Sequence, residues 1–201
     1  MRKAICLLCA AAMLVAALLI LPVHGEAAVY DRVIRLHVLA NSDSEEDQAL
    51  KLTVRDAVLS QTQALLADAT TREEAEAILA SNLDVIRVAA EEAVRASGAN
   101  ASVTVSLGEE QYPTRRYENL AFPAGEYLSL QVRLGEAEGK NWWCVLFPPL
   151  CLSAATAEHE TQEAFLAAGL TDEQYRMIAD TDSTKYKLRF KILEIAQRLF
   201  G

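Results

Sequence analysis

The spacing of apolar residues changes twice along this chain, and the change limits the folds that it can adopt. Val29–Ala40 alternates apolar and polar residues, which predicts a half-buried strand. From Ser42 to Ser97 the apolar residues recur at helical spacing, and alternation returns from Ala101. A strand, a helical stretch and then further strands predict an α+β fold.

Two capping boxes divide the helical stretch. Ser42 with Glu45 predicts the start of one long helix, and Thr71 with Glu74 predicts the start of a second. The second helix is expected to continue to Ser97, because a glycine at the next position favours a helix end.

The later strands are expected to include a hairpin. Tyr127–Leu134 and Asn141–Phe147 have strand character, and the polar, glycine-bounded segment 135–140 joins them. Helices are predicted at Thr156–Ala168 and Thr171–Ala179. Lys185–Phe200 fits both a strand period and a helical one, and its length and composition favour a helix. The expected class is therefore α+β, with an N-terminal strand, two long helices, antiparallel strands with a hairpin, and C-terminal helices.

The first 27 residues predict export. Two basic residues precede an unbroken apolar run, Ala4–Leu21, and a proline and the small residues of Gly25–Ala27 follow it. We expect cleavage after Ala27. Retention of residues 4–21 as a membrane anchor is the alternative, because the run is at the lower limit of a membrane span. Residues 28–201 would then form a single extracytoplasmic domain.

The charge of the predicted mature part argues against nucleic-acid binding. The first 28 residues hold two basic residues and one acid, which leaves 17 Lys and Arg against 27 Asp and Glu, a net charge of −10. An acidic chain without a basic groove is a poor ligand for a phosphate backbone.

The sequence offers no recognisable catalytic set. It contains no nucleophile elbow and no Ser-x-x-Lys motif, and a glycosidase pair among its many acids is left open. His37 has Asp43 and Asp47 within reach along the chain, but a metal site needs more ligands, and a surface or interface histidine is the simpler interpretation. We therefore expect no enzyme activity, no metal and no cofactor.

The segment NWWCVLFPPLC, residues 141–151, holds both tryptophans and two of the four cysteines. Cys144 and Cys151 are separated by six residues that include two prolines, so a disulfide is expected outside the cell. Two buried thiols are the alternative. In a strand, Trp142 and Trp143 point to opposite faces, so that one can enter the core while the other meets solvent or a partner.

Two blocks of this sequence resemble the stage II sporulation protein R family of endospore-forming bacteria. They are RLHVLANSDSEEDQALKLTVRDAV, from Arg35 to Val58, and YPTRRYENLAFPAGEY…GKNWWCVLFPPLC, from Tyr112 to Cys151. Their order and separation also fit, with an export signal in front.

The resemblance implies a signalling protein. Members are made in the forespore and exported into the space between the two membranes around it. There they trigger a membrane-embedded aspartic protease, the sigma-E factor-processing peptidase, which removes the pro-sequence of sigma-E. The alternative is an extracytoplasmic cell-wall hydrolase or glycan-binding module. No small-molecule substrate and no nucleic acid are expected.

The partner surface is expected within the two blocks, because they carry the resemblance. Arg and Trp are the residue types that dominate binding energy at interfaces. The predicted partner-binding residues are Arg35, His37, Asn41, Asp43, Tyr112, Arg115, Arg116, Trp142, Trp143 and Phe147.

Closing the short loop between Cys144 and Cys151 is expected to stabilise the domain by about 2–3 kcal/mol. The double change Cys144→Ser, Cys151→Ser should lower the unfolding midpoint and leave some signalling at low temperature, because the bridge is expected to be a staple and not a catalytic device. Mass spectrometry of the secreted protein in air tests the pairing, and two unmodified thiols would contradict it.

Overall fold

The computed structural model describes residues 29–117, 120–149 and 158–179, and the chain divides into two compact units. The larger unit comprises Tyr30–Glu110 and Glu126–Leu170, and the smaller one includes Gln111–Gly125 and Thr171–Ala179. The predicted single domain over residues 28–201 stays a prediction.

A four-stranded sheet organises the larger unit, and its strands run in the order β2-β5-β1-β6. β1 (Ile34–Leu39) pairs in parallel with β5 (Gly125–Leu134) and antiparallel with β6 (Asn141–Phe147). β2 (Val103–Tyr112) lies beside β5. The predicted hairpin of β5 with β6 is therefore wrong, because β1 occupies the position between them.

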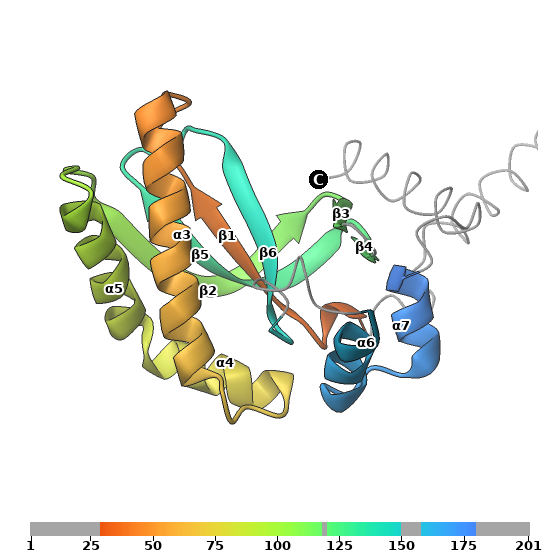
Figure 1. Cartoon of the computed structure of the whole chain (residues 1–201). Helices are drawn as coiled ribbons and strands as arrows, with labels where there is room; N and C mark the ends of the chain where they lie inside the picture. Colours follow the sequence, from red (N-terminus) through yellow and green to blue (C-terminus); the bar gives the residue numbers. More distant parts are fainter. Residues whose placement is uncertain (1–28, 118–119, 150–157, 180–201) are drawn as a thin grey trace, which may run out of the picture. The chain divides into compact units, whose positions relative to one another are not determined.

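Three helices cover one face of this sheet (Figure 1): α3 (Glu45–Leu65), α4 (Arg72–Ser81) and α5 (Leu83–Ala96). The capping box of Thr71 and Glu74 is confirmed. The first cap lies two residues later than predicted, since Ser44 accepts a hydrogen bond from the backbone of Asp47. The predicted second long helix is two helices, because the chain leaves helical geometry at Asn82.

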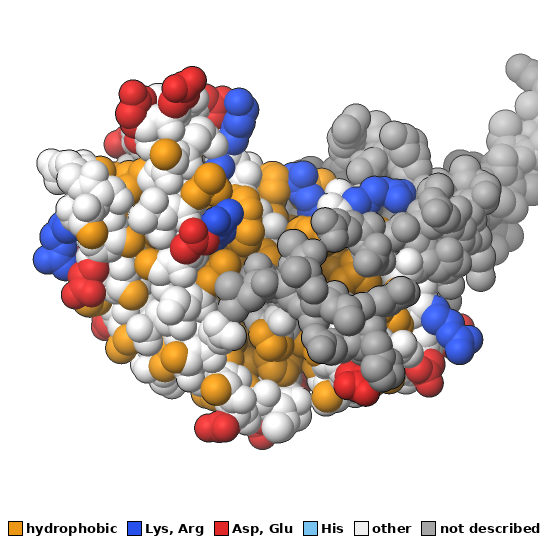
Figure 2. Space-filling model, in the orientation of Figure 1, with side chains coloured by type: hydrophobic (Ala, Val, Ile, Leu, Met, Phe, Trp, Pro, Cys, Tyr) orange, Lys and Arg blue, Asp and Glu red, His pale blue; other side chains and the backbone are white. Residues whose placement is uncertain are grey.

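The start of α3 is acidic. Glu45, Glu46 and Asp47 occupy its first turn, and Figure 2 shows acidic side chains gathered over this end of the helix. Carboxylates stabilise a helix N-terminus because they offset the partial positive charge of its backbone amides.

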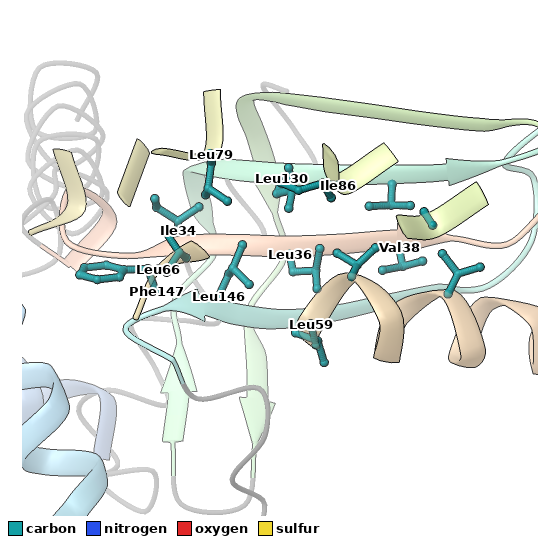
Figure 3. Packing of buried hydrophobic residues seen from close by; sticks show 14 of the residues in the cluster. Ile34, Leu36, Val38, Leu59, Leu66, Leu79, Ile86, Leu130, Leu146 and Phe147 are labelled. Atoms are coloured by element: carbon teal, nitrogen blue, oxygen red, sulfur yellow. The ribbon is translucent and has the colours of Figure 1, made fainter. Parts of the chain in front are cut away.

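The hydrophobic core fills the space between these helices and the sheet. Ile34, Leu36 and Val38 of β1 point into it together with Leu130 and Leu146 of the neighbouring strands (Figure 3). β1 is buried almost throughout, so the prediction of a half-buried strand is wrong. β1 has no exposed edge, because it pairs with β5 on one side and with β6 on the other. Its polar residues Arg35 and His37, on the face opposite the core, are buried as well.

The larger unit also contains α6 (Glu158–Ala167). The smaller unit pairs β3 (Arg115–Tyr117) with β4 (Leu120–Phe122) in an antiparallel arrangement, and α7 (Asp172–Ala179) contacts β4. Thr171 and Gln174 cap α7 as predicted.

The expected α+β class is confirmed, with a strand before the helices and further helices after the strands. Within residues 29–117, 120–149 and 158–179, no helix is long and apolar enough to cross a membrane. The predicted export signal and the segment Lys185–Phe200 lie outside these residues.

Leu130 is expected to be among the most sensitive core positions, because it lies on an inner strand and is fully buried. Leu130→Ala should lower the free energy of unfolding by about 2–5 kcal/mol, measured by urea denaturation. The control is Val88→Ala on α5, whose side chain is 41% exposed and which should change stability by less than about 0.5 kcal/mol. Equal losses in the two variants would contradict the core assignment.

Candidate functional site

The face of the sheet opposite α3, α4 and α5 carries polar residues and one tryptophan. The strand register aligns His37 of β1 with Gln131 of β5 and with Trp143 of β6. Registered neighbours share a face, so these side chains lie together. We call this the Trp143 face. Its residues are Arg35, His37, Thr104, Ser106, Glu110, Ser129, Gln131, Arg133, Trp143 and Val145.

Arg35 is an internal residue at one end of the Trp143 face. Its side chain is fully buried, its Nε donates a hydrogen bond to the carbonyl of Cys144 at 3.0 Å, and its guanidinium lies 5.1 Å from the ring centroid of Tyr127. Hydrogen bonding and cation–π attraction compensate the cost of burying the charge. Arg35 therefore links β1, β5 and β6 inside the structure, and does not form part of an exposed patch.

His37 lies at the centre of the face and is 5% exposed. Its Nδ1 is 2.7 Å from Oε1 of Glu110, and its ring stacks on the indole of Trp143 with the centroids 5.1 Å apart. These contacts join β1 to β2 on one side and to β6 on the other. His37 therefore contacts both Glu110 and the indole of Trp143.

The ionisation of Glu110 reflects this environment. Burial by itself would raise the pKa of its carboxyl group, but the hydrogen bond and the charge of His37 outweigh burial, with help from Ser129 and Arg133. The pKa of Glu110 is therefore below its ordinary value. The carboxylate form strengthens its hydrogen bond to the imidazole.

The other end of the Trp143 face is accessible. Thr104, Ser106 and Arg133 are exposed, and Gln131 and Trp143 are half-buried. Arg133 also donates to the side-chain amide oxygen of Gln131 at 2.7 Å. Trp143 on β6 and the pair of Gln131 and Arg133 on β5 lie on the same face, with β1 between them. Aromatic and Arg residues are the types that provide anchors at protein interfaces.

Trp142 lies on the opposite face, as alternation along a strand predicts. It packs against the helix-covered core, and the guanidinium of Arg55 on α3 lies 5.0 Å from its ring centroid. Phe147 is also part of this core. Both were predicted to contact a partner, and in the structure both pack against this core.

Asn41 and Asp43 hold two loops together. The side chain of Asn41 accepts a hydrogen bond from the backbone of Glu136 at 3.0 Å, and Asp43 accepts one from the backbone of Lys140 at 2.7 Å. The backbone of Gly139 donates to the carbonyl of Ala40 at 2.9 Å. These bonds tie the connection between β1 and α3 to the connection between β5 and β6.

Glycine is required where these two loops meet. A Cβ atom on Gly139 would collide with the carbonyl of Ser42, and one on Gly135 would collide with the side chain of Asn41. Gly135 also has a φ of +56°, which disfavours other residues. Asn41, Asp43 and Gly139, which lie in the two blocks, therefore have a structural role in joining the loops.

The remaining predicted residues are not part of the larger unit or are only partly described. Tyr112 is buried and Arg116 is exposed, and both belong with Arg115 to the smaller unit. Whether they join the Trp143 face stays a prediction. Cys144 is buried in β6 and is disulfide-bonded. Its predicted partner, Cys151, lies outside the described residues, so this pairing also stays a prediction.

Sequence reasoning missed Glu110, Gln131, Arg133 and Lys51. The first three lie at polar positions of alternating strands, and that alternation was their available signal. Lys51 is buried in α3, where its ammonium donates to the carbonyl of Lys140 at 3.0 Å. Burial lowers the pKa of Lys51, while the nearby charge of Asp43 opposes this shift. Among the described residues, no three His, Cys, Asp or Glu side chains gather as metal ligands.

Comparison with known proteins gives one consistent result. The family model described as "Stage II sporulation protein R (spore_II_R)" matches residues 30–157, which include β1, α3–α5 and the strands up to β6. The stage II sporulation protein R of Bacillus subtilis (strain 168) is 44% identical over 139 residues. That match covers 67% of this chain and 62% of the relative's length. No solved structure matches.

The lowered pKa of Glu110 predicts a pH dependence. The ionised carboxylate stabilises the fold at pH values above its unfolded pKa of about 4.3, and this contribution is lost as the pH falls through the lower folded-state pKa. Glu110→Gln should remove this part of the acid destabilisation as the pH falls below the unfolded-state pKa, measured by urea unfolding. Glu138→Gln, an equal charge change at an exposed turn, is the control. Identical pH profiles of the two variants would contradict the assignment.

Proposed function

This chain belongs to the stage II sporulation protein R family, and on that basis we propose that it is an exported signalling protein of sporulation. In this proposal it leaves the forespore and enters the space between the two surrounding membranes. There it binds the outward-facing part of a membrane-embedded aspartic protease, the peptidase that processes pro-sigma-E. Its role in sporulation follows from the family, and the mechanism is our proposal.

The Trp143 face is the observation that supports a binding role. It presents a half-buried indole that stacks on His37, and the exposed Arg133 lies on the same face two strands away. His37 is buried and contacts the half-buried Glu110, and its ring gives the indole a stacking surface before the partner arrives. Such preorganisation strengthens binding, because less conformational entropy is lost on association.

A ligand of this kind acts by differential binding. It shifts its receptor toward an active state only as far as it binds that state more tightly than the inactive one. A receptor with equal affinity for the ligand in both states would not respond. The ligand therefore needs a specific surface and no catalytic group of its own.

A glycan-binding module is the competing proposal. The same face suits it in one respect, because a half-buried indole among hydrogen-bonding side chains can also stack on a sugar ring. The two functions differ in their readout: a receptor ligand changes protease activity, and a glycan-binding module changes only attachment to cell-wall material.

Co-expression with the candidate protease and pro-sigma-E tests the proposal. We expect processing of pro-sigma-E only when the full chain is present, measured by immunoblotting. Deletion of Met1–Ala27 should abolish processing in the producing cell, because the predicted receptor surface lies across a membrane. Full activity of this truncated form, or processing without the chain, would contradict the proposal.

The paired tryptophans provide a matched comparison. Trp143→Ala should weaken receptor binding by at least about 2 kcal/mol and leave the domain folded, because this indole is proposed to meet the partner. Trp142→Ala removes the same side chain from the core-facing side, and should mainly lower stability. Circular dichroism and the processing assay are applied to both variants. If Trp143→Ala loses signalling only when it unfolds, the role of Trp143 is structural.

A further inference from the structure

The outer edge of β2 is an unusual feature of the sheet. Among the strands that the structure describes, β2 pairs with β5 alone, so it forms one edge. The carbonyl of Ser102 accepts a hydrogen bond from the backbone of Gly135, which directs it toward the β5 side. Because backbone groups alternate along a strand, those of Val103, Val105 and Leu107 point outward. Such an edge is a template for another strand.

The hydrophobic core is incompletely covered at this edge. On β5 the core-facing side chains Leu128, Leu130, Val132 and Leu134 are at most 5% exposed. The corresponding residues of β2, Val103, Val105 and Leu107, pack against the same core but are only partly buried. An additional strand beside β2 would cover this row and extend the core in the same layer.

The charge pattern favours a second copy of the chain as the additional strand. The protein has a net charge of −9, so two copies repel each other over most of their surface. Residues 97–108 contain no Asp, Glu, Lys or Arg, and they include Val103–Leu107, the first half of this edge. Natural edge strands often carry charges or prolines that block pairing, and Val103–Leu107 has neither.

We propose that two copies of this protein associate through antiparallel pairing of their β2 strands about a two-fold axis at Val105. In this register Val103 lies opposite Leu107 of the other copy, and Thr104 lies opposite its Ser106. The apolar residues then meet on the core side, and the hydroxyl groups meet on the other side, where such cross-strand pairs are favourable. Glu109 falls beyond the paired segment, so no like charges face each other.

Pairing of this type joins the two sheets into one continuous sheet with closed two-fold symmetry. It presents two Trp143 faces from one particle, because each copy contributes its own. This inference concerns the assembly of the ligand and does not depend on the identity of the receptor.

Charge substitutions at two exposed positions test both the pairing and its register. Thr104 and Ser106 are exposed, so changes there should leave the fold intact. Thr104→Lys with Ser106→Lys places lysines opposite each other twice in the dimer, and should weaken dimerisation at least about tenfold. Thr104→Lys with Ser106→Glu places opposite charges together and should preserve the dimer. Sedimentation velocity of the purified full chain measures the mass at several concentrations.

Mixing two oppositely charged variants tests the pairing directly. The double-lysine variant and the variant Thr104→Glu, Ser106→Glu should each be monomeric and should form a heterodimer when mixed. A wild-type chain that stays monomeric at every concentration would overturn the proposal. Equal dimerisation of all variants would place the interface elsewhere and would also overturn it. Loss of the dimer in the Lys–Glu variant would overturn the register. Circular dichroism confirms that each variant is folded.

Discussion

The position of β1 in the middle of the sheet is the constraint on which the larger unit depends. β5 and β6 are consecutive in the chain, and β1, far earlier in sequence, lies between them. Both of its edges are paired and its residues are almost entirely buried. Every polar side chain on β1 must therefore find its partners inside the protein, since an unsatisfied buried polar group costs free energy.

That requirement explains the two polar residues of β1. Arg35 bonds to the backbone of β6 and lies against Tyr127 of β5, and His37 joins Glu110 of β2 to Trp143 of β6. Together they connect β1 with all three other strands on one face. Aliphatic residues on the opposite face do the same through the core. The sheet is thus held by polar contacts on one face and by hydrophobic packing on the other.

The insertion of β1 also brings the two family blocks together. One block contains most of β1, its following loop and most of α3, and the other includes β6 and the end of the loop before it. Asn41 and Asp43 from the first bond to the backbone of Glu136 and Lys140, close to or within the second. The resemblance therefore includes the residues that hold these two loops together, and these residues have a structural role. The half-buried Trp143 is one residue of the second block that lies outside the helix-covered core.

Local sequence rules determined the elements of this protein, and tertiary pairing decided their arrangement. Alternation predicted the strands and the opposite faces of Trp142 and Trp143, and the side-chain cap of Thr71 and Glu74 predicted the start of α4, because both features depend on neighbouring residues. The hairpin of β5 and β6 was the natural local expectation, but β1 lies between them and pairs with both. The same long-range pairing turned Arg35 and His37 from expected surface residues into internal ones, and brought Glu110 to His37 across 73 positions of sequence. Sequence periodicity specifies which way a side chain points from its strand, whereas only the neighbouring strands decide whether that direction leads to solvent or to the interior.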